Sequence, residues 1–371
     1  MSFYLGIMSG TSLDAIDCVI VSFDQITPQI ITTQSIEFPN QLKKRLLNLI
    51  NAAEGSLKEI GTLDTQLGEL YAYAANQIIH HSNVSHSDIT AIGCHGQTIY
   101  HQPNQPYPFT WQLGNMQLIA KTTNLTTIGD FRRLDMAYGG QGAPLAPAFH
   151  QAVFKSDHEK RVIVNLGGIA NISCLNPKCN DVIGFDTGPS NALLDLWYQS
   201  IYQHDKTYDD QGRWAASGMV YEQLLNLLLT DPYFKKSYPK STGKEYFNQK
   251  WLNSYLTQID NPLKPEDIQA TLSQLTAKTI ANAILKAQPE TESVYLSGGG
   301  AYNTDLVKRL KLELQPISVD TTETLGIAPT WVEASLIAWL SMMRLEHRVS
   351  NLTSVTGADE QLSLGTIYLP N

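Results

Sequence analysis

Residues 4–21 read YLGIMSGTSLDAIDCVIV, two short apolar runs around a polar centre. The runs, 4–8 and 16–21, are rich in β-branched residues and predict two buried strands. The centre holds small polar residues and two carboxylates: Ser9, Gly10, Thr11, Ser12, Asp14 and Asp17. A plain hairpin needs only a turn residue or two. The stretch therefore predicts a strand–turn–strand unit whose turn holds a ligand.

The same pattern recurs at residues 161–175, RVIVNLGGIANISCL. Alternating strands and helices follow both units, which predicts an α/β fold with two related domains facing each other across a cleft. The charged stretch KSDHEKR, 155–161, marks the expected boundary. We expect domains at 1–155 and 156–371, and the C-terminal segment can pack back on the first.

Composition excludes several classes of protein. With 371 residues the chain is long enough for about two domains of roughly 150 residues. A net charge of −9 argues against a nucleic-acid binder, which needs a basic surface. We find neither a signal-peptide pattern nor a membrane span, and Cys174 and Cys179 lack the spacing of a zinc site. These features are typical of a reduced, cytoplasmic protein.

Three small-residue turns are candidates for binding phosphate. They are residues 9–12, the pair Gly167–Gly168, and the run Gly298–Gly299–Gly300. Consecutive small residues let backbone N–H groups point into a concavity that suits an anion. Carboxylates beside phosphates usually hold Mg²⁺, and Asp14 and Asp17 are placed for that. The pattern predicts ATP with Mg²⁺.

Two familiar nucleotide motifs are absent. In STGKEYF, 241–247, Lys244 precedes Glu245 instead of Ser or Thr, and the upstream glycine is missing, so we discount a Walker A loop. SGGGAYN lacks the third glycine position of a Rossmann fingerprint. A triphosphate held by two hairpins in facing domains is the arrangement of actin, hexokinase and Hsp70-like ATPases.

Longer motifs carry a specific resemblance, in order and over nearly the whole chain. They are GIMSGTSLDAIDCV, GCHGQT, GDFRRLDMAYGGQGAPLAPAFH, NLGGIAN, GFDTGPSNALLD, WAASG, KSTGKEYFN, DIQATLSQLTA, SGGGAYN, GIAPTWVEASLIAWL and NLTSVTGA. The sequence resembles the anhydro-N-acetylmuramic acid kinase family. The resemblance implies a two-domain actin/hexokinase-like (ribonuclease H-like) fold with its active site in the interdomain cleft, and a homodimer.

The family's chemistry is ATP-dependent hydrolytic opening of the 1,6-anhydro ring with phosphorylation of O6. The products are N-acetylmuramic acid 6-phosphate and ADP, in bacterial peptidoglycan recycling. The resemblance implies a catalytic role for Asp186. It also implies nucleotide binding by the whole first turn, namely Gly10, Thr11, Ser12, Leu13, Asp14, Ala15, Ile16 and Asp17.

The predicted sugar-binding residues are His95, Gly96, Gln97, Asp130, Arg132 and Glu333. Each has a structural alternative: His95 as a hydrogen-bonded core histidine, the arginines 132 and 133 as surface charges, Glu333 in an ion pair. One of the two arginines suffices for the lactyl carboxylate of the sugar, and Asp130 can orient that arginine or a sugar hydroxyl. Asp186 is itself a common type of turn residue before a helix.

Two positions depart from the family pattern, because Ala15 and Ser190 stand where glycine is usual. Ala15 would cost about 1 kcal/mol or more only if its φ were positive. Ser190 is placed to cap the following helix.

Three other functions remain open from the residues alone. They are a kinase of the same fold acting on another free sugar or carboxylate, a non-catalytic nucleotide-binding regulator, and a metal-dependent hydrolase using His95. The first is distinguished by consumption of the open sugar, the second by ATP binding without turnover. No HxH or HExxH spacing supports the third.

Overall fold

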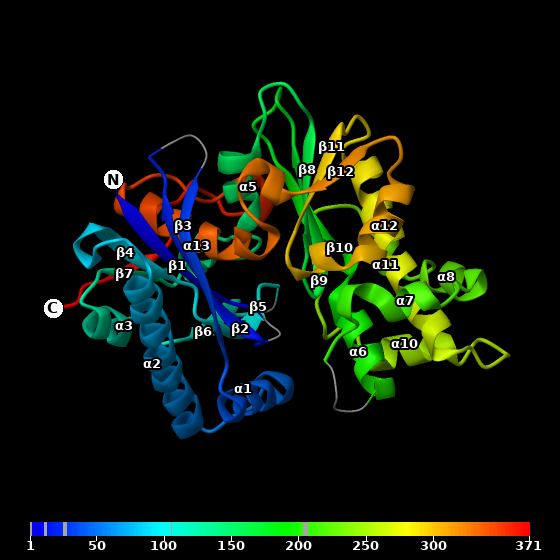
Figure 1. Ribbon diagram of the computed structural model, residues 1–371, viewed down its shortest axis with the longest axis horizontal. Helices are drawn as coiled ribbons and strands as arrows, with labels where there is room; N and C mark the ends of the chain where they lie inside the picture. The colour runs from blue at the N-terminus through cyan, green and yellow to red at the C-terminus, as the bar shows by residue number, and fades with distance from the viewer. Residues whose placement is uncertain (1, 11–12, 25–27, 105, 203–206) are drawn as a thin grey trace. The chain divides into compact units, whose positions relative to one another are not determined.

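The computed structural model describes residues 2–10, 13–24, 28–104, 106–202 and 207–371 (Figure 1). Its contacts divide the chain into two compact units, residues 1–153 with 331–371, and residues 154–330. Residues 331–371, predicted within the second domain but able to pack back on the first, belong to the first unit. Among the described residues, no helix is long and apolar enough to cross a bilayer.

The first unit contains a six-stranded sheet with the order β13-β7-β4-β1-β2-β3. The strands are β1 (Phe3–Ser9), β2 (Ala15–Ser22), β3 (Gln29–Glu37), β4 (Ile89–Cys94), β7 (Thr127–Gly129) and β13 (Thr366–Tyr368). β1, β2 and β3 are antiparallel neighbours, whereas β1, β4 and β7 are parallel. The two predicted strands of the opening stretch are thus confirmed as the antiparallel pair β1 and β2, and they lie within a mixed sheet.

Helices cover this sheet and supply its core. They are α1 (Asn40–Ala52), α2 (Leu57–His81), α3 (Met116–Thr123), α4 (Arg133–Ala137), α5 (Ala146–Phe154), α13 (Val332–Leu345) and α14 (Thr353–Thr356). β5 (Gln97–Gln102) and β6 (Phe109–Leu113) form a separate two-stranded sheet. Leu63, Leu67 and Tyr71 on α2 are fully buried with strand residues such as Ile7 and Ile16.

α13 packs directly on β1 and β4 because both strands carry a glycine at the contact. A Cβ at Gly6 would collide with the carbonyl oxygen of Ala334, and one at Gly93 with the side chain of Ser341. Such close approach is open only to glycine. The apolar stretch around Glu333 is therefore a buried helix of the first unit.

The second unit contains a five-stranded sheet with the order β10-β9-β8-β11-β12. The strands are β8 (Arg161–Leu166), β9 (Ile169–Leu175), β10 (Ile183–Pro189), β11 (Ser293–Ser297) and β12 (Ser318–Thr321). Three antiparallel strands followed by two parallel ones repeat the order β3-β2-β1-β4-β7 of the first unit. This shared topology confirms an α/β fold built from two related units.

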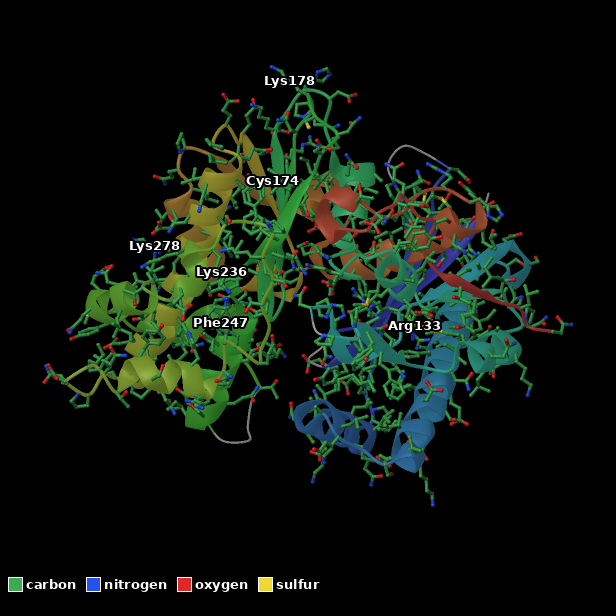
Figure 2. All side chains as sticks on the ribbon, turned by 180° about the vertical axis from the view of Figure 1, so that it is seen from behind. Arg133, Cys174, Lys178, Lys236, Phe247 and Lys278 are labelled. Atoms are coloured by element: carbon green, nitrogen blue, oxygen red, sulfur yellow. The ribbon has the colours of Figure 1, made fainter. Side chains whose placement is uncertain are left out.

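The helices of the second unit surround the long α11 (Pro265–Ala287). They are α6 (Asn191–Tyr202), α7 (Arg213–Ser217), α8 (Glu222–Leu228), α9 (Pro232–Lys235), α10 (Gln249–Leu256) and α12 (Thr304–Glu313). Phe247 (Figure 2) packs with Tyr233 and Trp251 in an apolar cluster beside α8. Asn303 caps α12 by accepting from the Leu306 N–H.

Two local predictions need correction. DTGP was expected as a turn after a strand, but β10 continues through Pro189, so Asp186 lies within the strand. The Ser190 hydroxyl is buried without a partner in the described chain and does not cap α6. The reason is that the N–H groups of residues 190–192 already donate to the carbonyls of Gly167 and Gly168.

Candidate active site

Asp186 lies on β10, the edge strand of the second sheet, and is half-buried. Its Oδ2 accepts a hydrogen bond from the Thr242 N–H at 3.0 Å. Burial raises the pKa of Asp186 to about 6; the Thr242 N–H opposes this shift, and the charge of Glu245 adds to it. A carboxylate with a pKa near the working pH is suited to act as a general base.

The segment 240–242 holds both the backbone N–H and the side-chain carboxylate of Asp186. The Asp186 N–H donates to the Lys240 carbonyl at 3.2 Å, and Thr242 binds the carboxylate. The Tyr233 hydroxyl donates to the Asp186 carbonyl at 2.7 Å. Asp231 in turn anchors this region, because it accepts from the Tyr246 and Tyr255 hydroxyls and from the Trp251 indole.

Lys244 lies over the hairpin turn between β8 and β9. A Cβ built on Gly168 would be 3.0 Å from Lys244 Cε and 3.8 Å from its Nζ. The turn's carbonyls bond to α6, and among the described hydrogen bonds none uses the Gly167 or Gly168 N–H as donor. Free N–H groups beside an ammonium suit a phosphate. Sequence reasoning missed Lys244 because only its proximity in space to Gly168 reveals it.

We expect Lys244→Ala to raise the KM for ATP about tenfold, because one charge-assisted hydrogen bond is worth about 1.5–3 kcal/mol. Steady-state kinetics with varied ATP measures this. Lys250→Ala, an equally exposed lysine on α10, should leave KM unchanged. Equal KM values in the two variants would refute a phosphate contact by Lys244.

In the glycine run at the end of β11, two glycines are required by packing and one faces open space. A Cβ at Gly300 would lie 2.7 Å from Leu166 Cβ, and Gly298 has φ +78° beside Asn165. These two glycines are needed for packing against β8. A Cβ at Gly299 meets nothing within 4 Å, so only this glycine leaves open space for a ligand.

The first turn is described only in part, because Thr11 and Ser12 lie outside the described residues. On either side of them, the Leu13 N–H donates to the Gly10 carbonyl at 3.2 Å. Leu13 is buried with φ +54°, and Ile16 belongs to the core. Ala15 has no positive φ and begins β2, so its methyl group causes no backbone strain.

The two carboxylates beside this turn differ in environment. Asp14 is exposed and pairs with Lys43 Nζ at 2.8 Å. Asp17 is half-buried on β2 and accepts from the Ser35 hydroxyl, and burial raises its pKa. The described residues contain no group of three or more His, Cys, Asp or Glu side chains that could hold a metal ion by themselves.

Ser9 connects the first turn to the predicted sugar-binding segment. Its hydroxyl donates to Gln97 Oε1 at 2.9 Å and bonds to the Tyr71 hydroxyl at 2.8 Å. All three side chains are buried. Gln97 also donates to the Thr98 carbonyl, so its amide is used within the protein. It is therefore suited to fix the turn.

His95, Arg132 and Glu333 come together in the first unit. His95 Nδ1 binds the Gly96 carbonyl at 2.8 Å, and its Nε2 accepts from Arg132 Nε at 2.9 Å. Burial and the charge of Arg132 lower the pKa of His95 to about 3. His95 is thus a neutral acceptor that orients Arg132. Burial lowers the pKa of Arg132 to about 10, and Glu333 opposes that shift.

The C-terminal segment helps to position Arg132 through a chain of hydrogen bonds. Arg132 Nη1 donates to the Gly142 carbonyl at 2.8 Å. Asp135 holds the same residue by accepting from the Gly142 N–H, and it also accepts from Asn351 and from the Thr356 hydroxyl at 2.7 Å. Asn351 and Thr356 of the NLTSVTGA motif therefore help to position Arg132, through Asp135 and Gly142.

Asp130 and Arg133 form a second pair. Asp130 Oδ2 lies 3.6 Å from Nη1 of the exposed Arg133. Asp130 has φ +53°, and its Oδ1 is buried without a partner among the described residues. A strained residue with an unpaired buried acceptor is typical of a binding site.

Comparison with known proteins identifies the family. The sequence profile of the anhydro-N-acetylmuramic acid kinase family matches residues 2–370. The chain belongs to the anhydro-N-acetylmuramic acid kinase family. It is 48% identical over 367 residues to the anhydro-N-acetylmuramic acid kinase of Coxiella burnetii, covering 98% of this chain and 97% of that one. The kinase of Saccharophagus degradans is 45% identical, with coverage of 100% and 99%.

Solved structures similar to this chain include an activator of 2-hydroxyisocaproyl-CoA dehydratase from Clostridium difficile with bound ADPNP. Its TM-score is 0.46 at 13% identity, with 94% of this chain and 99% of that chain covered. A ROK family glucokinase from Streptomyces griseus gives a TM-score of 0.40 at 12% identity, with coverage of 93% and 100%. Similarity at this level carries no argument about the site.

Proposed function

We propose that this protein is an anhydro-N-acetylmuramic acid kinase that opens the 1,6-anhydro ring with water and transfers the γ-phosphoryl group of ATP to O6. The single observation that supports the chemistry is Asp186, a half-buried carboxylate with a pKa of about 6 that the Thr242 N–H holds at one oxygen. The family resemblance extends the proposal to bacterial cell-wall recycling, a cytoplasmic location and a homodimer.

The reaction needs a base for water, because an intramolecular acetal has no free O6 to phosphorylate. Asp186 takes a proton from water as its oxygen bonds to the anomeric carbon. The bond from that carbon to O6 breaks, O6 bonds to the γ-phosphorus, and ADP leaves. Thr242 occupies Oδ2, and Oδ1 forms no hydrogen bond within the described chain, so Oδ1 is the oxygen assigned to the proton.

The nucleotide and the sugar are assigned to different residues. Gly10, the first turn, Gly167–Gly168, Lys244 and Gly299 are proposed to bind ATP. Arg132, oriented by His95, is proposed to bind the lactyl carboxylate, and Asp130 Oδ1 to accept from a sugar hydroxyl. Glu333 balances the charge of Arg132.

Mg²⁺ fits this set only with help from the nucleotide. Because no three-ligand cluster exists among the described side chains, phosphate oxygens and water must complete its shell, which is usual for this ion. Asp17 is the candidate carboxylate, since Asp14 is paired with Lys43. When bound, Mg²⁺ would neutralise charge on the transferring phosphoryl group.

An ADP-release assay tests the function by comparing anhydro-N-acetylmuramic acid with N-acetylmuramic acid. We expect ADP only with the anhydro sugar, in equal amount to the sugar phosphate. ADP release with the open sugar alone would establish an ordinary sugar kinase. ATP binding without turnover of either would establish a regulator.

The pH profile tests the role of Asp186. Because the base must be deprotonated, kcat/KM should fall about tenfold per pH unit below a pKa of about 6 and level off above it. Initial rates from pH 4.5 to 8.5, as test conditions, measure this limb. The residual activity of Asp186→Asn is the control for titration of ATP. Its kcat/KM should not show the fall at acid pH. A limb that persists there would assign it to another group.

A further inference from the structure

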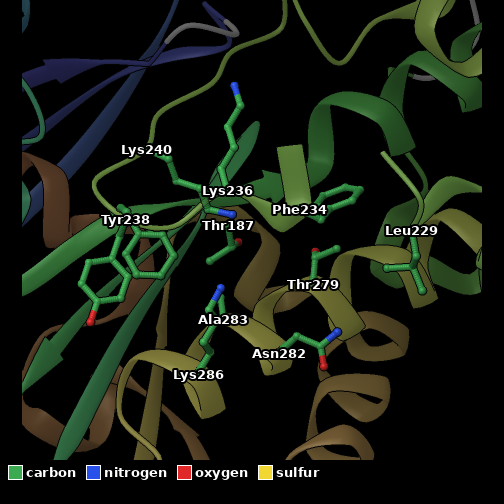
Figure 3. A pocket seen from close by; sticks show the side chains of 11 residues that line it. Thr187, Leu229, Phe234, Lys236, Tyr238, Lys240, Thr279, Asn282, Ala283 and Lys286 are labelled. Carbon is green, nitrogen blue, oxygen red and sulfur yellow. The ribbon is translucent and has the colours of Figure 1, made fainter. Parts of the chain in front are cut away.

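A basic pocket lies in the second unit, beside β10 and α11 (Figure 3). Its cavity volume is about 90 Å³. The wall combines aromatic rings, hydroxyls and ammonium groups and includes Phe185, Thr187, Tyr238, Lys240, Thr279 and Lys286. Phe185 and Asp186 are neighbours on one strand, and successive side chains point to opposite faces. The pocket is therefore on the other face of β10 from the catalytic carboxylate.

The charge of the pocket wall is positive, although the Asp186 carboxylate attracts Lys240 from outside the wall. Lys236, Lys240 and Lys286 line it, and none of the described lining residues is Asp or Glu. None of the three lysines forms an ion pair within the described chain. Figure 3 shows the amines of Lys240 and Lys286 pointing toward one another, whereas Lys236 points away. Two converging ammonium groups are suited to hold an anion between them.

Neighbouring groups position the Lys240 ammonium group in the pocket. Its Nζ donates to the Tyr233 carbonyl at 3.3 Å and lies 4.6 Å from the centre of the Tyr233 ring. An ammonium group has three donors, so others remain for a ligand. The stacked rings of Phe185 and Tyr238, 5.2 Å apart, form one wall. Burial and the charges of Lys286 and Lys236 lower the pKa of Lys240, and the charge of Asp186 opposes this shift.

The size of the cavity selects the ligand class. A volume of about 90 Å³ is well below the roughly 300–1,000 Å³ of pockets that enclose whole small molecules. It suits a single tetrahedral anion. We propose that this pocket is a second anion-binding site, separate from the ATP and sugar sites, which takes inorganic phosphate or the terminal phosphate of a phosphomonoester between Lys240 and Lys286.

The site is connected to the catalytic residue through one short segment. The Lys240 side chain lines the pocket, and its carbonyl accepts the Asp186 N–H at 3.2 Å. Two residues later, Thr242 binds the carboxylate. Phosphate binding therefore fixes the segment that positions Asp186, which gives the pocket a route to regulate turnover.

The binding test uses ³¹P NMR titration of inorganic phosphate into the full-length protein, at constant ionic strength and with saturating AMP-PNP. The analogue fills the triphosphate site, and its signals are distinct from free phosphate. We expect saturable binding that weakens at least tenfold in Lys286→Ala. Lys286 is exposed, so this variant should fold. Lys278→Ala, on the same helix but outside the pocket (Figure 2), should bind as the wild type does.

Two results would overturn the site: no saturable binding, or equal affinity in Lys286→Ala and Lys278→Ala. A second arm replaces phosphate with N-acetylglucosamine 6-phosphate. Equal affinity supports the terminal phosphate of a larger ligand, and binding of inorganic phosphate alone supports the free ion. Since both arms measure binding, they do not depend on the proposed kinase activity.

Hydrogen exchange tests the connection to Asp186. Phosphate should slow exchange of the amides in 240–244 several-fold in the wild type and not in Lys286→Ala. Unchanged exchange at saturating phosphate would refute the regulatory route.

Discussion

Asp186→Asn is expected to lower kcat by roughly 10²–10⁴-fold, the range typical of a general base. Asparagine has nearly the same shape and can still bond to the Thr242 N–H after rotation, but it cannot take a proton from water. ATP and the sugar should therefore bind with little change. The kinetics of ADP release measure the loss of turnover, and direct binding measurements with ATP and with the sugar show whether affinity is kept.

Glu245→Gln is the matched control for Asp186→Asn. The charge of Glu245 raises the pKa of Asp186, so its removal should move the acid limb to lower pH while turnover continues. Near-normal activity of Asp186→Asn would exclude Asp186 as the base and leave Glu333 or Asp130 as candidates.

Oxygen labelling tests which atom water attacks in the wild-type reaction. In ¹⁸O-water the label should enter the anomeric hydroxyl and stay out of the phosphate, because O6 attacks phosphorus. Label in the phosphate group would show that water attacks ATP, and it would overturn the coupled mechanism.

Arg132→Ala is expected to lower kcat/KM for the sugar roughly 10²–10³-fold, since truncating one partner of a buried charge pair costs about 2–5 kcal/mol. Arg132 is half-buried and held by His95 and Gly142, so its guanidinium is preorganised for a carboxylate. The KM for ATP should remain unchanged. Initial rates with each substrate varied measure the difference.

Arg133→Ala controls for charge at the neighbouring position. Arg133 is exposed and faces Asp130, so its loss should change kcat/KM only a few-fold. Thermal unfolding of both variants separates misfolding from lost binding, and Arg132→Lys tests whether charge alone suffices. Equal losses in Arg132→Ala and Arg133→Ala would contradict the assignment of the carboxylate to Arg132.

The sequence by itself determined the two hairpins and the family. Apolar strands around small-residue turns follow from local patterning, which acts over a few residues and does not depend on the rest of the chain. The motifs from residue 4 to NLTSVTGA carry the family because each is long and they occur in order. The candidate base Asp186 and the glycine turns were also identified from the sequence.

Only the tertiary structure decided what each polar group does. Arg132 was predicted to bind the sugar, but what separates it from the adjacent Arg133 is its burial and its partners, which depend on the fold. His95 is an acceptor for Arg132 since both are enclosed, and Lys244, discounted as part of a failed motif, lies over Gly168 through a contact between distant segments. The placement of α13 in the first unit likewise depends on Gly6 and Gly93. Such contacts join residues far apart in the chain, so local patterning cannot encode them.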